Sequence, residues 1–191
     1  MHCPTELNKR KLRLLTANNV TTDSRGVRKL IDEKCYRSAI ELTARLLKIY
    51  GDGFKHSSHS FQLWFTRLSL LIKIGENDGA KTESEAFEQL TNPDFYYEHK
   101  EPQVFKSKRG SIASFAFRLF LAELPLRYHK PRPKLAVTNL INLLETTKKI
   151  RQFFADGKKE TEMNFWKERE IKVLCSLINC AASVSIHYEL Y

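Results

Sequence analysis

Apolar residues recur three and four positions apart along most of this chain, with polar residues between them. Such spacing places apolar side chains on one face of an α-helix. The clearest example lies in residues 59–75, where one face carries Phe61, Trp64, Phe65, Leu68, Leu71 and Ile72. We predict a helix here, and its apolar face requires other helices to cover it.

Helix signals of the same kind occur in other segments. Asp23 is a suitable N-cap for a helix that extends to about Lys34. Gly75 is a suitable end for the helix at 59–75, because glycine adopts the left-handed conformation that often follows a helix. The remaining predicted helices cover residues 36–50, about 77–91, about 111–124, about 133–154 and about 161–191.

The last predicted helix has an apolar side of its own. Along it lie Trp166, Val173, Leu174, Leu177, Ile178, Ala181 and Tyr188. Little in the chain favours a β-sheet, since it contains only 7 glycines, 6 prolines and few alternating β-branched residues. The predicted fold class is therefore all-α.

The positions of certain residues favour antiparallel helix pairs stacked as a solenoid. Trp64, Ala80 and Pro93 fit the tryptophan, alanine and proline positions of a tetratricopeptide repeat. Phe120 and Ala136 give a second, looser match. We predict a tetratricopeptide-like solenoid.

Hydrophobic periodicity suggests where the folded domain begins, and the net charge suggests which partners the chain could bind. Residues 1–22 lack a sustained period and are predicted to form a flexible basic arm, followed by the repeat domain over 23–191. The formal net charge of +10 favours an acidic partner, but the basic residues occur in small dispersed groups, as is typical of solvated helix ends. A basic helical module that binds RNA or another polyanion is the alternative function.

Motifs for catalysis, cofactors and metals are missing from the sequence. It contains no GxSxG, HExxH or phosphate-binding loop, so we expect neither an enzyme nor a cofactor. His56 and His59 lack a third ligand nearby, so no metal site is expected. Glu83, Glu85 and Glu88 share no face and are expected to be solvated. Four cysteines without a CxxC motif, and no apolar run of about 20 residues, predict a reduced cytosolic protein that is not integral to a membrane.

The longest predicted connection contains three adjacent aromatic residues, Phe95, Tyr96 and Tyr97, and ends near Lys108 and Arg109. Aromatic residues beside basic ones are the residue types that anchor protein interfaces. These five residues are the candidate partner-binding site. The alternative is that the aromatic residues attach the connection to the helices.

Three segments together carry a resemblance to a known family. They are SFQLWFTRLSLLIKIG, NPDFYYEH and SKRGSIASFAFRLFLAELP, in that order. This order resembles the tetratricopeptide region of subunit 12 of the trafficking protein particle (TRAPP) complex, and the resemblance extends over about residues 25–190.

The resemblance implies a non-catalytic scaffold subunit whose partners are other subunits of the tethering complex. It further implies a role in endoplasmic-reticulum-to-Golgi vesicle tethering and autophagy. The implied location is the cytoplasm, associated with the endoplasmic reticulum-Golgi intermediate compartment and the Golgi, with membrane association only through the complex. Members of the family have further repeats, so we expect the last helix to be the first helix of a truncated repeat.

Overall fold

The computed structural model describes residues 15–50, 57–87, 95–99 and 110–189, with side chains described as far as residue 183. Seven α-helices occur in this part of the chain: α1 (Ser24–Asp32), α2 (Tyr36–Tyr50), α3 (Ser58–Lys73), α4 (Asn77–Ser84), α5 (Phe115–Glu123), α6 (Pro133–Asp156) and α7 (Glu160–Glu189). Short 3-10 helices lie at Ala17–Asn19, Glu85–Phe87, Tyr97–His99 and Leu124–Arg127. No β-strand occurs among the described residues, only one isolated bridge.

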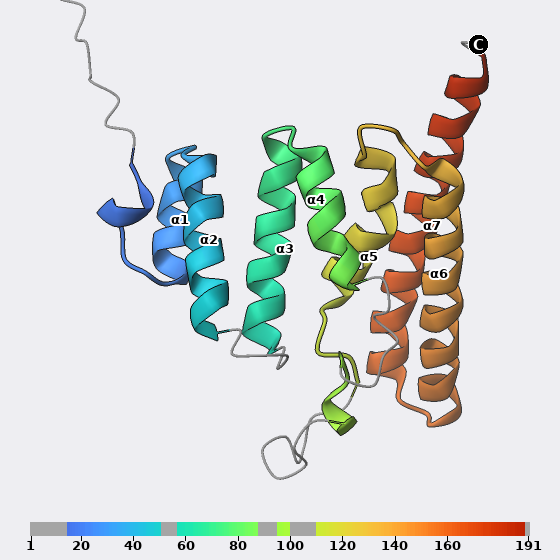
Figure 1. Cartoon of the computed structure of the whole chain (residues 1–191). Coiled ribbons are helices and arrows are strands. Elements are labelled where there is room, and N and C mark those ends of the chain that lie inside the picture. The colour runs from blue at the N-terminus through green and yellow to red at the C-terminus, as the bar shows by residue number, and fades with distance from the viewer. Residues whose placement is uncertain (1–14, 51–56, 88–94, 100–109, 190–191) are drawn as a thin grey trace, which may run out of the picture.

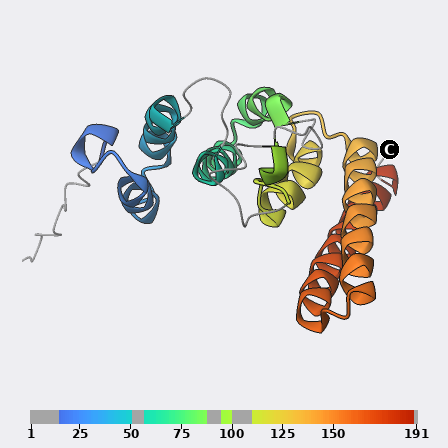
Figure 2. The same ribbon diagram turned by 90° about the horizontal axis from the view of Figure 1, so that it is seen from below.

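The helices stand side by side in a row that follows their order in the sequence (Figure 1). Seen from below, α1, α3 and α5 lie along one side of the row, and α2 and α4 lie along the other (Figure 2). The long helices α6 and α7 form an antiparallel pair at the end of the row. The predicted all-α fold of stacked helix pairs is confirmed.

The buried apolar residues form three successive clusters instead of one central core. The first joins Ala17–Asn19, α1, α2 and α3. The second joins α3, α4, the aromatic residues at 95–97 and α5, and the third joins α5, α6 and α7. Each helix therefore packs mainly on its neighbours in sequence, as expected of a solenoid.

Four of the five residues that matched the repeat pattern lie in packed positions of the described structure, and Pro93 lies outside the described residues. Ala80 and Ala136 are fully buried. The ring of Trp64 packs edge-on against Phe87 at 5.4 Å between centroids, and Phe120 packs against Phe65 at 5.3 Å. Small residues let the helix backbones approach, and the large rings fill the space beside them.

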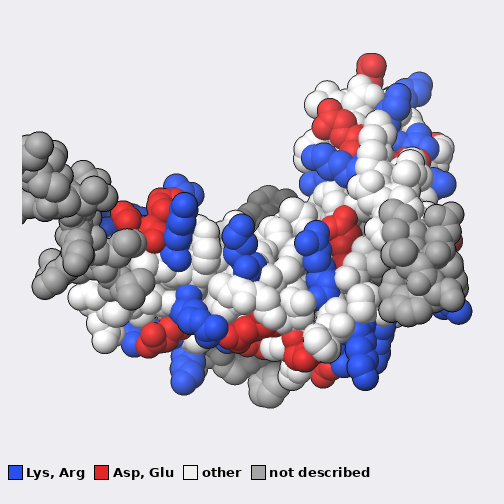
Figure 3. All heavy atoms as spheres, turned by 90° about the horizontal axis from the view of Figure 1, so that it is seen from above, with Lys and Arg blue, Asp and Glu red and all other residues white. Residues whose placement is uncertain are grey.

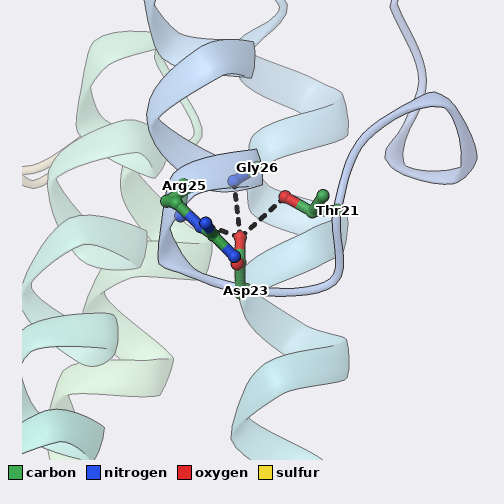
Figure 4. Close-up of polar contacts among 4 residues, drawn as sticks. All are labelled: Thr21, Asp23, Arg25 and Gly26. Atoms are coloured by element: carbon green, nitrogen blue, oxygen red, sulfur yellow. Dashed lines mark hydrogen bonds and ion pairs between the residues drawn. The ribbon is translucent and has the colours of Figure 1, made fainter.

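The first helix begins at the predicted cap, Asp23 (Figure 4). Its carboxylate accepts hydrogen bonds from the backbone N–H groups of Arg25 (3.0 Å) and Gly26 (2.9 Å), and from the hydroxyl of Thr21 (2.7 Å). The Gly26 bond lowers the pKa of Asp23 most, followed by the Thr21 bond and by the side chain of Arg25, whose Nε donates to the carboxylate at 2.8 Å. Position 26 requires glycine, because a Cβ there would lie 1.9 Å from the carbonyl oxygen of Thr21.

Replacing Asp23 with alanine is expected to lower the melting temperature at neutral pH by about 2–4 °C, because the first turn loses its cap. The pKa of Asp23 is lower in the folded chain than in the unfolded chain, where it is about 3.9. The ionised carboxylate therefore contributes its full stabilisation above about pH 3.9, and this contribution declines as the pH falls below that value. Melting curves between pH 7 and pH 3 check this. Asp23→Asn is the control, because asparagine caps nearly as well but does not titrate. A difference in melting temperature between Asp23→Ala and the unchanged chain that stayed constant over this pH range would contradict the account.

Two predicted helices have different bounds in the structure. The helix expected from residue 111 begins at Phe115. Ser111 is bridged to Tyr96, the N–H of Ile112 donates to the carbonyl of Phe95, and the hydroxyl of Ser114 caps the helix by accepting from the N–H of Phe117 at 3.2 Å. The helix expected over 77–91 is α-helical to Ser84 and continues as a 3-10 helix over Glu85–Phe87, and residues 88–91 lie outside the described residues.

The packed structure includes residues N-terminal to the predicted domain boundary at 23. Ala17 is buried, and Leu15 and Val20 pack beside it on the first cluster. The basic residues at 9–13 lie outside the described residues.

The last helix packs differently from the predicted pattern. Val173, Leu177 and Cys180 lie against α6 and α5. Leu174 and Ile178, which were expected on the same side, are exposed. The buried face of α7 is therefore rotated relative to the prediction.

Candidate interaction surface

Residues 95–97 are attached to the segment before α5 by backbone hydrogen bonds. The N–H of Tyr97 donates to the carbonyl of Gly110 (3.0 Å), and the N–H of Ile112 donates to the carbonyl of Phe95 (2.9 Å). Tyr96 and Ser111 form the isolated antiparallel bridge. Residues 95–97 of the predicted connection are therefore held beside the segment that precedes α5, and the rest of the connection up to residue 109, apart from 98 and 99, lies outside the described residues.

Arg118 of α5 holds the ring of Tyr96. Its guanidinium lies 5.5 Å from the ring centroid, within the range of a cation–π interaction. Its Nη2 and Nε donate to the hydroxyl of Ser111 at 2.7 and 3.0 Å, which orients the guanidinium. Glu98 completes the arrangement by accepting a hydrogen bond of 2.6 Å from the N–H of Gly110.

The three aromatic residues of the predicted site have different surroundings. Phe95 is buried and packs edge-on against Phe61 at 5.7 Å between ring centroids. Tyr96 and Tyr97 are half-buried at the edge of the second cluster. Lys108 and Arg109 lie outside the described residues. Of the five predicted residues, Tyr96 and Tyr97 thus present described side chains at the surface.

Charged residues of both signs are interspersed over the face seen from above (Figure 3). Ion pairs among the described residues join Arg37 to Glu76 at 2.9 Å and Arg151 to Glu170 at 2.7 Å. Glu83, which was expected to be solvated, instead pairs with Arg67 at 2.6 Å. Mixed charge of this kind gives this face no continuous basic surface for a polyanion.

The exposed face of α7 is an apolar surface whose residues were not among the predicted site residues. Ile171, Leu174 and Ile178 are exposed and follow the i, i+3, i+7 spacing that places them in one stripe. Ile178 alone is 68% exposed. Contiguous exposed apolar side chains are typical of a surface that another protein covers. The rotation of α7 could not be read from periodicity alone, because apolar residues occur on more than one of its sides.

The described residues contain no group of three or more His, Cys, Asp or Glu side chains arranged to hold a metal ion. His59 packs its ring edge-on against Tyr50 at 4.8 Å. Cys180 is buried, and burial together with the nearby Glu123 raises the pKa of its thiol, which favours the unreactive protonated form. None of the helices in the described ranges is both long and apolar enough to span a membrane.

Trafficking protein particle complex subunit 12 of Mus musculus is 32% identical to this chain over 188 residues, and that of Homo sapiens is 31% identical over 189 residues. Each alignment covers 89% of this chain. The resemblance to the TRAPP subunit 12 family is confirmed.

The chain spans about a quarter of the length of these subunit 12 relatives, 24% and 25% respectively. No model of a known protein family matches the chain, and no solved structure matches it. The relationship to the subunit 12 family therefore rests on sequence similarity, and the solenoid fold rests on the arrangement of the helices.

Proposed function

We propose that this chain is a non-catalytic interaction subunit that binds other subunits of a TRAPP-type tethering complex. The similarity to TRAPP subunit 12 over 89% of the chain carries this proposal. By the same resemblance, we propose a role in endoplasmic-reticulum-to-Golgi vesicle tethering and autophagy, in the cytoplasm and beside the Golgi and its intermediate compartment.

Two features of the fold support a binding role. Stacked helix pairs present an extended surface on which a partner can lie. The exposed stripe of α7, formed by Ile171, Leu174 and Ile178, offers apolar area that is favourable to bury in a complex.

Affinity purification tests the proposal. A tagged form of the chain is purified from the cells that make it, and the co-purifying proteins are identified by mass spectrometry against a tag-only control. Other TRAPP subunits should be enriched together. If RNA-binding proteins and RNA are recovered in their place, and the recovery disappears at moderate salt, the polyanion alternative is correct.

We further propose that Tyr96 and Tyr97, with Lys108 and Arg109 nearby in sequence, contact a partner subunit. Replacing both tyrosines with alanine should reduce recovery of TRAPP subunits about tenfold, because aromatic anchors dominate interface energies. Circular dichroism shows whether the variant is folded, and Tyr50→Ala, at a half-exposed tyrosine on α2, is the matched control. Undiminished recovery with a folded double variant would remove these tyrosines from the binding surface.

A further inference from the structure

A groove runs between α5 and the segment at 95–98 on one side and helices α6 and α7 on the other. Its volume is about 680 Å³. The apolar part of its wall includes Phe115 from α5, Phe154 from α6 and Trp166 from α7. Tyr96 of the candidate surface also lines it. The groove thus combines aromatic side chains from three helices with the bridged segment.

Arg169 of α7 has an unusual position in this groove. Its guanidinium carbon lies 4.2 Å from the ring centroid of Phe165, 4.3 Å from that of Trp166 and 5.1 Å from that of Phe115. No acidic side chain forms an ion pair with Arg169 within the described part of the chain. Burial among the rings lowers the pKa of Arg169, but an arginine remains protonated near neutral pH.

The rings hold the guanidinium in place but leave its hydrogen-bonding groups without an anion. A guanidinium has five N–H donors in a planar fork that matches a carboxylate. Cation–π contacts use the face of this group, so the N–H groups at its edge stay available. Arg169 is therefore preorganised to bind a carboxylate.

The other polar groups of the groove are mostly engaged within the chain. The hydroxyls of Thr146 and Thr147 donate to the carbonyls of Asn142 (2.9 Å) and Leu144 (2.8 Å). Lys149 is exposed and adds its positive charge to those of Arg169 and Arg118, which also line the groove. An occupant would consequently be selected by negative charge at Arg169 and Lys149, and by apolar area against the rings.

We infer that this groove binds an acidic segment of a partner protein, with an Asp or Glu carboxylate on Arg169 and a neighbouring apolar side chain against Phe115 and Phe154. This inference rests on the proposed function, because the segment would belong to another TRAPP subunit. The inference adds to the proposed function that the partner segment at the surface around Tyr96 carries a carboxylate and an apolar side chain.

A peptide fits the groove better than a nucleic acid does. A nucleic acid carries a negative charge at every phosphate and needs a continuous basic surface, whereas the groove wall places its cations beside apolar side chains and one acidic residue, Glu98. Bases also need free aromatic faces on which to stack, whereas Arg169 lies over the rings of Trp166 and Phe115. A peptide can place a single carboxylate at the guanidinium.

Photocrosslinking in the assembled complex tests the inference. The full chain is expressed in its own cells with p-benzoylphenylalanine in place of Phe153, an exposed side chain that lines the groove. The same replacement of Ile49, an exposed residue of α2, is the control. After irradiation and purification, the crosslinked peptides are sequenced. A segment of another TRAPP subunit that carries Asp or Glu beside apolar residues is expected from position 153 and not from position 49.

Other crosslinking results would overturn the inference. These are a crosslink from position 153 to a segment without acidic residues, a crosslink to RNA, or no crosslink while TRAPP subunits still co-purify. In the last case the proposed function stands and only the groove assignment fails. Absence of TRAPP subunits from the purified material would refute the proposed function itself.

A charge reversal provides a second readout that does not disturb packing. Lys149→Glu should reduce the yield of the crosslink from position 153 about tenfold, since the new carboxylate repels an acidic segment. Lys148→Glu, an equal charge change at an exposed neighbour that does not line the groove, should change the yield less than about twofold. Equal yields from the two variants would contradict an acidic occupant.

Discussion

Replacing Phe117 with alanine is expected to lower the free energy of unfolding by about 3–5 kcal/mol. Phe117 is 0% exposed and lies where α3, α4 and α5 meet. Its ring centroid is 5.3 Å from that of Phe87, 5.6 Å from that of Phe65 and 5.9 Å from that of Phe61. Removing the ring leaves a cavity that three rigid neighbours cannot fill, so both burial and packing are lost.

Chemical denaturation followed by circular dichroism measures this loss. Phe153→Ala is the matched control, since Phe153 is 69% exposed and its replacement should change the free energy of unfolding by no more than about 1 kcal/mol. If Phe117→Ala were as mild as Phe153→Ala, the second cluster would not connect the helix pairs as described.

Replacing Arg67 with alanine is expected to cost about 2–3 kcal/mol of stability. Arg67 of α3 donates to both carboxylate oxygens of Glu83 on α4 at 2.6 Å, and to the carbonyl of Ile40 on α2 at 2.8 Å. Its side chain is 16% exposed and that of Glu83 is 25% exposed, so the loss is smaller than for a fully buried pair. One guanidinium thus joins three successive helices.

A double-mutant cycle isolates this interaction. Arg67→Ala and Glu83→Ala should together cost less than the sum of the two single changes, with a coupling of about 1–2 kcal/mol. Arg67→Lys should be intermediate, because lysine keeps the charge but not the two-pronged geometry. Arg37→Ala, which breaks an ion pair whose side chains are 79% and 46% exposed, should cost less than about 1 kcal/mol. A cost for Arg67→Ala no larger than that for Arg37→Ala would contradict the linking role.

Helix positions could be predicted from the sequence because local signals fix them. The cap at Asp23 and the left-handed glycine at Gly75, with φ of 81°, are both confirmed. The buried alanines Ala80 and Ala136 fall at the positions that the repeat pattern requires. Periodicity, capping and glycine geometry act within a few residues, so the sequence shows them directly.

Interactions between distant segments could not be predicted in the same way. The segment at 111–113 was predicted to be helical, but its backbone pairing with Phe95 and Tyr96 holds it outside the helix. The ion pair between Glu83 and Arg67 was not predicted, because Arg67 lies sixteen residues earlier in the sequence. Arg169 had no sequence signal either, because its aromatic surroundings come partly from Phe115 on another helix. Tertiary packing decided each of these cases.

Velocity sedimentation of the untagged chain, extracted from the cells that make it, tests the central claim most directly. If the chain is a TRAPP interaction subunit, it should sediment with other TRAPP subunits, well ahead of a 22.3 kDa protein. Immunodepletion of another TRAPP subunit should then remove it from these fractions. Sedimentation of the whole population as a free 22.3 kDa chain, whether or not the complex is depleted, would contradict the account.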